Sequence, residues 1–185
     1  NLGPSYSSKE IIKIFKKRKY KYRKFKLIEK EIAGLLQQNK IIGYFYGQME
    51  FGPRALCNRS IIYHCKDKSI NDWLNKRLNR TEFMPFAPVT TSELASRCFI
   101  DWKKDHFSSD FMTVTYDVTS EFKKLCPACV HVDGTARPQI IRKKNDPQMH
   151  KIITYYNKKY GDLALINTSF NNHEEPIVCS PDNAI

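Results

Sequence analysis

The apolar residues of this chain change their spacing from one segment to the next, and this alternation limits the folds open to it. Some segments repeat apolar residues every three or four positions, as one face of a helix does, whereas others are the short apolar runs typical of strands. The helical pattern predicts helices over residues 27–38, 70–78 and 147–160. The strand pattern predicts strands over residues 41–46, 60–64, 111–116, 130–132, 139–142 and 163–167. We therefore expect a mixed α/β domain.

Length and composition indicate one globular domain. With 185 residues, of which 41% are apolar and 27% charged, the chain is long enough to bury a single core without disulfide support. No apolar run approaches the roughly 18 residues of a membrane span, and no secretory signal opens the sequence. We expect a cytoplasmic protein with no membrane partner.

Both ends of the chain have the character of domain junctions. A Gly-Pro turn near the start precedes Ser7 and Ser8, either of which can cap a helix. At the other end, SPDNAI starts a further helix with proline at its first position. We expect residues 1–185 to be one domain excised from a longer protein.

Six cysteines are scattered along the chain, and without a secretory signal they are expected to stay reduced. Cys126 and Cys129 have the spacing of zinc and redox sites, and His131 lies close by. A structural zinc needs four ligands, however, and the other candidates have no motif spacing. We expect ordinary thiols and no metal site.

The net charge of +12 is concentrated near the N-terminus. The first 40 residues hold twelve Lys and Arg against three Glu, whereas the rest of the chain holds nineteen against sixteen acidic residues. At the centre of this excess is the basic run KKRKYKYRKFK, which begins at Lys16, ends at Lys26 and contains three aromatic residues. Such a run could follow a phosphate backbone and stack on bases. It could equally be a solvated helix end or linker.

Two segments place arginine beside a break in regular structure. In GQMEFGPRALCNRSII, Arg54, Asn58 and Arg59 follow a Gly-Pro break between two apolar runs. In LNKRLNRTEFMPFAPV, Arg80 follows a predicted helix and precedes an extended PFAP, although basic residues at helix ends are also favoured by the macrodipole. Arginines beside amides or hydroxyls suit a polyanionic small molecule.

The segment HVDGTARPQII presents His131, Asp133, Thr135 and Arg137 within a few residues. An Asp-Gly turn between two strands is explained by a hairpin alone. The hydroxyl and the guanidinium that follow the turn are, in addition, suited to phosphate oxygens.

In LALINTSFNNHEEPIV an apolar strand runs directly into Asn167, Thr168, Ser169 and Asn171. The carboxyl end of a buried strand is where α/β folds place ligands. A plain exit from a strand into a loop also gives polar residues, but this polar stretch is longer than a turn requires.

These four segments resemble the C-terminal domain of the carbamoyltransferase family that includes nodulation protein U and the O-carbamoyltransferases of antibiotic biosynthesis. The motifs GQMEFGPRALCNRSI, RTEFMPFAP, HVDGTARPQ and NTSFNNHEEPIVCSPDNAI carry the resemblance over nearly the whole chain, although the basic run has no counterpart. The resemblance implies a YrdC-like fold, a twisted mixed α/β sheet with flanking helices around a basic cavity.

The resemblance also implies an activity. This domain would bind carbamoyl phosphate and ATP, with Mg²⁺ accompanying the nucleotide, and form carbamoyl adenylate. An N-terminal actin-like, metal-dependent domain of the same protein would transfer the carbamoyl group to a hydroxyl acceptor. The motif positions imply these substrate- and nucleotide-binding residues: Arg54, Asn58, Arg59, Arg80, His131, Asp133, Thr135, Arg137, Asn167, Thr168, Ser169 and Asn171.

The chain departs from the family pattern in places. Relatives have further basic residues just before PFAP, where this chain has Asn79 and Met84, and a glycine is common where Cys57 stands. One alternative is a nucleic-acid-binding module that uses the basic run, because YrdC-like folds resemble RNA-binding proteins. Another is a docking domain that has lost catalytic activity.

Overall fold

The computed structural model describes residues 2–78, 85–172 and 174–185. Its centre is a five-stranded sheet in the order β1-β2-β7-β3-β6, and β4 pairs with β5 in a separate small sheet. Neighbouring strands are antiparallel except β3 and β6, which are parallel. The strands are β1 (Ile42–Phe45), β2 (Arg59–His64), β3 (Ala87–Thr91), β4 (Tyr116–Asp117), β5 (Thr135–Ala136), β6 (Gln139–Ile141) and β7 (Leu165–Ser169).

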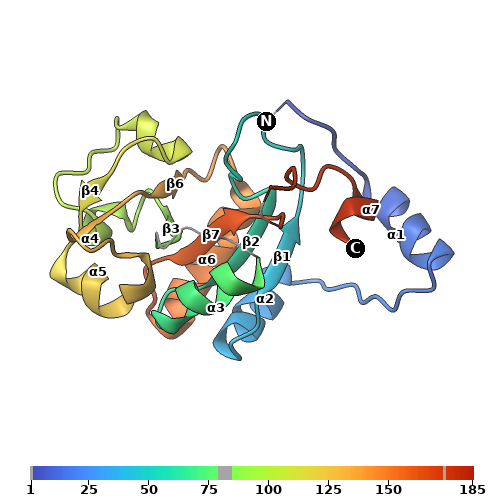
Figure 1. Cartoon of the computed structure of the whole chain (residues 1–185), viewed down its shortest axis with the longest axis horizontal. Coiled ribbons are helices and arrows are strands. Elements are labelled where there is room, and N and C mark those ends of the chain that lie inside the picture. The colour runs from blue at the N-terminus through green and yellow to red at the C-terminus, as the bar shows by residue number, and fades with distance from the viewer. Residues whose placement is uncertain (1, 79–84, 173) are drawn as a thin grey trace.

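Helices cover both faces of the central sheet, with α3 in front of it and α6 behind in Figure 1. The α-helices are α1 (Ser8–Lys17), α2 (Ile28–Gln37), α3 (Ser69–Arg77), α4 (Ala95–Cys98), α5 (Ser120–Leu125), α6 (Pro147–Tyr160) and α7 (Pro181–Ala184), and the 3-10 helices are η1 (Phe107–Phe111) and η2 (Pro127–Cys129). The longest, α6, begins where the Asp146 side chain accepts a hydrogen bond from the Met149 amide. It ends at Gly161, whose φ of 80° suits a glycine cap.

The buried core divides into two clusters, one on each face of the sheet. Side chains alternate along a strand, so Ile61 of β2 belongs to the cluster that contains residues of α3 and α5, whereas its neighbour Ile62 belongs to the cluster that contains residues of α2 and α6. All six residues of β2 are buried. The single core expected from the sequence is therefore two half-cores that share the strands between them.

The predicted mixed α/β fold is confirmed, and most predicted elements lie within two residues of their expected positions. The strand predicted over residues 111–116 is wrong, because η1 ends there and Met112 has a left-handed φ of 57°, which a strand cannot contain. The strand predicted over residues 130–132 is also wrong. That stretch leads into a tight turn in which the His131 amide donates to the Thr135 carbonyl, and β5 pairs with β4 instead.

Where the sequence predicted only an extended PFAP, the structure has the interior strand β3, although proline is rare in such strands. Pro88 is the second residue of β3 and pairs with Ile166 of β7. The parallel ladder to β6 begins one residue later, at Val89. The missing N–H of Pro88 therefore removes no hydrogen bond from the parallel ladder between β3 and β6.

The N-terminal segment packs at one end of the sheet. Ser7, one of the two predicted caps, caps α1, and α1 lies beside α7 (Figure 1). Arg18, just after α1, forms an ion pair with Asp182 of α7. The Phe15 ring contacts the rings of Tyr20 and Tyr22. Two aromatic side chains of the basic run are thus engaged within the chain itself. Among the described residues, no helix has the length and apolar composition needed to cross a bilayer.

Substitutions at Gly43 and Gly34 should change the stability of the fold in opposite directions. A Cβ on Gly43 of β1 would lie 2.8 Å from the ring of Phe170, so Gly43→Ala should force that ring to move and lower the free energy of unfolding by about 1–3 kcal/mol. A Cβ on Gly34 of α2 meets nothing within 4 Å, and Gly34→Ala should raise the free energy of unfolding by about 0.5–1 kcal/mol. Urea denaturation measures both changes. An unchanged or raised stability in the Gly43 variant would contradict the close packing of Phe170.

Candidate functional site

A cavity of about 280 Å³ brings together segments that are far apart in the sequence. It lies between the loop before β2, the start of β3 and the end of β7. Six of the residues predicted to bind phosphates line it: Arg54, Arg137, Asn167, Thr168, Ser169 and Asn171. The structure therefore places two arginines with hydroxyl and amide side chains around one space, which we call the first cavity.

The loop that carries Arg54 is held by a buried carboxylate. Glu50 is only 5% exposed, and its Oε1 accepts hydrogen bonds from the amides of Leu56, Asn58 and Arg59 at 2.6, 2.7 and 3.1 Å. Because three amides of residues 56–59 donate to it, this single oxygen fixes both ends of the loop. The sequence analysis did not identify Glu50. Glu50 stands two positions before the Gly52-Pro53 break, but its partners are backbone amides, so the sequence carries no signal for this role.

Cys57 occupies a backbone position that favours glycine. Its φ is 72°, in the left-handed region that glycine adopts most readily. The Cys57 thiol is completely buried, and it donates to Oε1 of Gln139 at 3.3 Å. Burial raises the pKa of this thiol, so it stays protonated and acts as a donor.

Asn167 joins the loop to two strands. Its Nδ2 donates to the Ala55 carbonyl at 2.9 Å and to Gln139 Oε1 at 2.6 Å. Asn167 is 2% exposed, and its Oδ1 has no hydrogen-bond partner among the described residues. Together, Asn167, Gln139 and Cys57 form a buried polar layer, which supports one wall of the first cavity.

Arg59 and Asn58 do not line the first cavity. The Arg59 side chain is buried and donates to the carbonyls of Tyr46, Gly47, Asn58 and Pro4, at 2.8–3.3 Å. Its guanidinium also lies 3.7 Å from the centre of the Phe45 ring. Burial lowers the pKa of Arg59, and the nearby Glu50 opposes that shift. Arg59 therefore holds the chain around β1 and lies outside the first cavity, while its role as a phosphate ligand stays a prediction.

The predicted residues before Arg137 form a self-contained turn. Asp133 Oδ1 accepts from the amide and hydroxyl of Thr135, at 3.0 and 2.8 Å, and these bonds lower the pKa of Asp133. His131 Nδ1 lies 3.0 Å from the Thr135 hydroxyl, and burial lowers the pKa of His131. None of these three residues lines the first cavity, whereas Arg137 does. The remaining prediction, Arg80, lies outside the described residues.

Cys65, Cys126 and Cys129 lie together in the core. Cys65 Sγ lies 3.4 Å from Cys129 Sγ, and Cys126 is buried beside them. Burial raises the pKa of Cys65 and Cys129, which disfavours the thiolate form that binds metals. In the part of the chain that the structure describes, no group of three or more His, Cys, Asp or Glu side chains is arranged to hold a metal ion.

Known proteins share both the sequence and the fold. Residues 33–185 match the family model described as carbamoyltransferase C-terminus. An uncharacterised protein of Methanocaldococcus jannaschii is 36% identical over 99% of this chain and 30% of its own length. A 3'-hydroxymethylcephem-O-carbamoyltransferase of Amycolatopsis lactamdurans is 32% identical over 80% of this chain and 27% of its own length. The chain thus spans about a third or less of these relatives.

Among solved structures, full-length HypF in a phosphate- and nucleotide-bound form is similar, with a TM-score of 0.60 and 19% identity over 84% of this chain and 22% of HypF. HypF of T. kodakarensis is similar with a TM-score of 0.58 and 13% identity, over 89% of this chain and 20% of its own length. At these identities the likeness concerns the fold alone. It confirms the YrdC-like fold class expected from the sequence.

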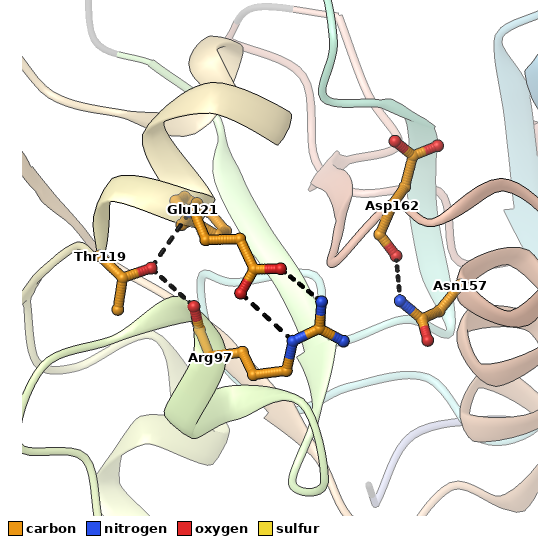
Figure 2. Close-up of polar contacts among 6 residues, drawn as sticks. Arg97, Thr119, Glu121, Asn157 and Asp162 are labelled. Atoms are coloured by element: carbon orange, nitrogen blue, oxygen red, sulfur yellow. Dashed lines mark hydrogen bonds and ion pairs between the residues drawn. The ribbon is translucent and has the colours of Figure 1, made fainter.

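Removing the carboxylate that holds the loop should be costly. Glu50→Ala leaves three amides without their acceptor, and each buried unpaired group costs about 1–3 kcal/mol, so we expect a loss of at least ~3 kcal/mol in the free energy of unfolding. Glu121→Ala is the matched control, because Glu121 pairs with Arg97 at the surface (Figure 2), where side chains exposed by 44% and 47% make an ion pair worth about 0–1 kcal/mol. Thermal and urea denaturation of both variants measure the difference. Equal losses would contradict a holding role for Glu50.

Proposed function

The chain belongs to the family of carbamoyltransferase C-termini, and from this membership we propose that its first cavity binds carbamoyl phosphate and ATP and forms carbamoyl adenylate. An N-terminal actin-like domain of the full-length protein would then transfer the carbamoyl group to a hydroxyl acceptor. The carbamoyltransferase of Amycolatopsis lactamdurans supports the transferase class. The finer assignment of substrates is our inference from the cavity.

One observation carries the proposal: Arg54 and Arg137, from distant parts of the chain, line the same cavity. The hydroxyls of Thr168 and Ser169 and the amide of Asn171 line it as well. Guanidinium groups bind phosphate oxygens in a bidentate manner, and hydroxyls and amides complete the hydrogen bonds of those oxygens. The cavity is small for a whole nucleotide, so it suits the phosphate-bearing part of the substrates.

The proposed reaction needs charge neutralisation and alignment more than protein nucleophiles. Water takes the phosphoryl group from carbamoyl phosphate and leaves carbamate. A carbamate oxygen then attacks the α-phosphorus of ATP, the bond from that phosphorus to its bridging oxygen breaks, and pyrophosphate leaves. The two arginines offset negative charge on the reacting phosphates and hold the attacking oxygen near the α-phosphorus.

Mg²⁺ would accompany the nucleotide, held mainly by phosphate oxygens and water, and would help to neutralise the triphosphate. Glu174 is the acidic residue among those that line the first cavity. Arg54 and Arg137 outnumber it, so the lining fits an anionic ligand that brings its own cation.

The nucleic-acid alternative is not favoured. The family match begins at residue 33 and leaves the basic run outside it. No residue of the run lines the first cavity, and two of its three aromatic rings contact Phe15. Salt dependence separates the two readings, because binding through the run should fall steeply with added salt and vanish when its charges are neutralised.

The activity itself can be tested on this chain. We expect residues 1–185 to bind ATP and, when carbamoyl phosphate is added, to exchange labelled pyrophosphate into ATP without carbamoylating a hydroxyl acceptor. The reason is that adenylate formation is reversible within one cavity, whereas transfer is assigned to the other domain. ATP binding without any exchange would reject adenylate formation. Robust O-carbamoylation by this chain alone would reject the division of labour.

The arginines should affect binding and not folding. A charged hydrogen bond to phosphate contributes about 1.5–3 kcal/mol, so Arg54→Ala and Arg137→Ala should each weaken ATP binding by about ten- to a hundredfold. Arg97→Ala is the matched control, because Arg97 pairs with Glu121 (Figure 2) and neither residue lines the first cavity. Calorimetric titration and melting temperatures should be measured on the same samples. Unchanged affinity in both cavity variants would contradict the proposed site.

A further inference from the structure

A second cavity, of about 410 Å³, lies beside the first. Its lining comes from the end of β1, from η1, from β6 and from the start of α6. We propose that this second cavity binds a ligand that carries several hydroxyl groups on an apolar ring, such as a sugar or cyclic polyol, separately from the phosphate-bearing ligand of the first cavity. Four features of its lining support this assignment.

The first feature is charge. Asp110, Asp146 and Arg142 line the second cavity, and Arg142 Nε already donates to Asp110 Oδ2 at 2.7 Å. Arg142 is therefore already joined to a carboxylate, and the lining carries two acidic side chains against one arginine. Burial raises the pKa of Asp146. A neutral ligand fits this wall better than a phosphate does.

The second feature is a set of polar atoms that lack partners. Asp110 Oδ1, Arg142 Nη2 and Asp146 Oδ2 are buried, and none of them has a hydrogen-bond partner among the described residues. Asp110 is only 9% exposed. Leaving such atoms unpaired costs about 1–3 kcal/mol each. These atoms have almost no solvent-accessible surface, so a ligand reaches them only when the side chains around them move. A hydroxyl both donates and accepts, and it can then serve the carboxylates and the guanidinium alike.

The third feature is aromatic surface. Tyr46 and Phe111 line the second cavity, and they are 45% and 54% exposed. The C–H faces of a sugar ring are apolar and pack on aromatic rings, while its hydroxyls extend sideways to polar groups. Aromatic rings together with amides and carboxylates thus match both surfaces of such a ring.

The fourth feature is the layer between the cavities. Gln139 lines the second cavity and Asn167 lines the first, and their direct hydrogen bond of 2.6 Å closes the wall between them. The loop held by Glu50 contributes Arg54 to one side and Asn58 to the other. The cavities are neighbours with separate linings, which allows independent occupancy.

An NMR titration of the ¹⁵N-labelled chain tests the proposal, with D-glucose and myo-inositol as hydroxylated probes and inorganic phosphate as the anionic probe. We expect the hydroxylated probes to shift the amides of Ile141, Arg142 and Asn145, and phosphate to shift the amides of Arg54 and Arg137. Tyr46→Ala and Asn145→Ala should each weaken binding of the hydroxylated probe by roughly fivefold, as the loss of about 1 kcal/mol predicts.

Two controls separate the possible outcomes. Trp73→Ala removes an aromatic ring that is 53% exposed on α3, outside both linings, and should leave the titrations unchanged. Arg54→Ala should abolish the phosphate response and preserve the glucose response. Loss of both responses in the Arg54 variant would show one continuous site and overturn the proposal, as would shifts without saturation at any residue. Glucose binding in a chain that fails to bind ATP would refute the proposed function and leave this inference standing.

Discussion

The hydrogen bonds that Glu50 accepts organise the region on which both cavities depend. One buried oxygen accepts from three amides on either side of the turn into β2, so the loop and the strand form one rigid unit. Arg54 projects from this unit at the first cavity and Asn58 at the second. Without that carboxylate the Gly-Pro break would leave a flexible connection, and the arginine would have no fixed position relative to the end of β7.

The sheet supplies the second half of the arrangement. Because β7 lies between β2 and β3 and is antiparallel to both, the start of β2, the start of β3 and the end of β7 lie at the same end of the sheet. Helices cover both faces of these strands, so the open ends of the strands are the natural place for a polar cavity. The layer of Asn167, Gln139 and Cys57 then divides the polar region in two.

The sequence predicted the residues of this region better than their individual roles. The polar residues Asn167, Thr168 and Ser169 of β7 were recognisable because an apolar run stops abruptly there. Arg54 and Arg59 belong to one motif, yet only the structure shows that Arg59 lies inside the chain among carbonyl groups, since that depends on how β1 and β2 pair. The strand predicted over residues 130–132 failed for a similar reason, because local alternation cannot show which partner strand lies alongside. Glu50 escaped notice because its partners are backbone amides, which have no sequence signature.

Cys57 gives the divided region a built-in reporter. Its thiol lies in the layer between the cavities, shielded from solvent and held in the protonated form. A thiol in such a place can react with an external reagent only while the surrounding structure is open. Its rate of alkylation therefore depends on how often the loop opens. Any ligand that stabilises the closed loop should slow that reaction, whichever cavity it occupies. Cys57 thereby makes the opening of this loop chemically observable.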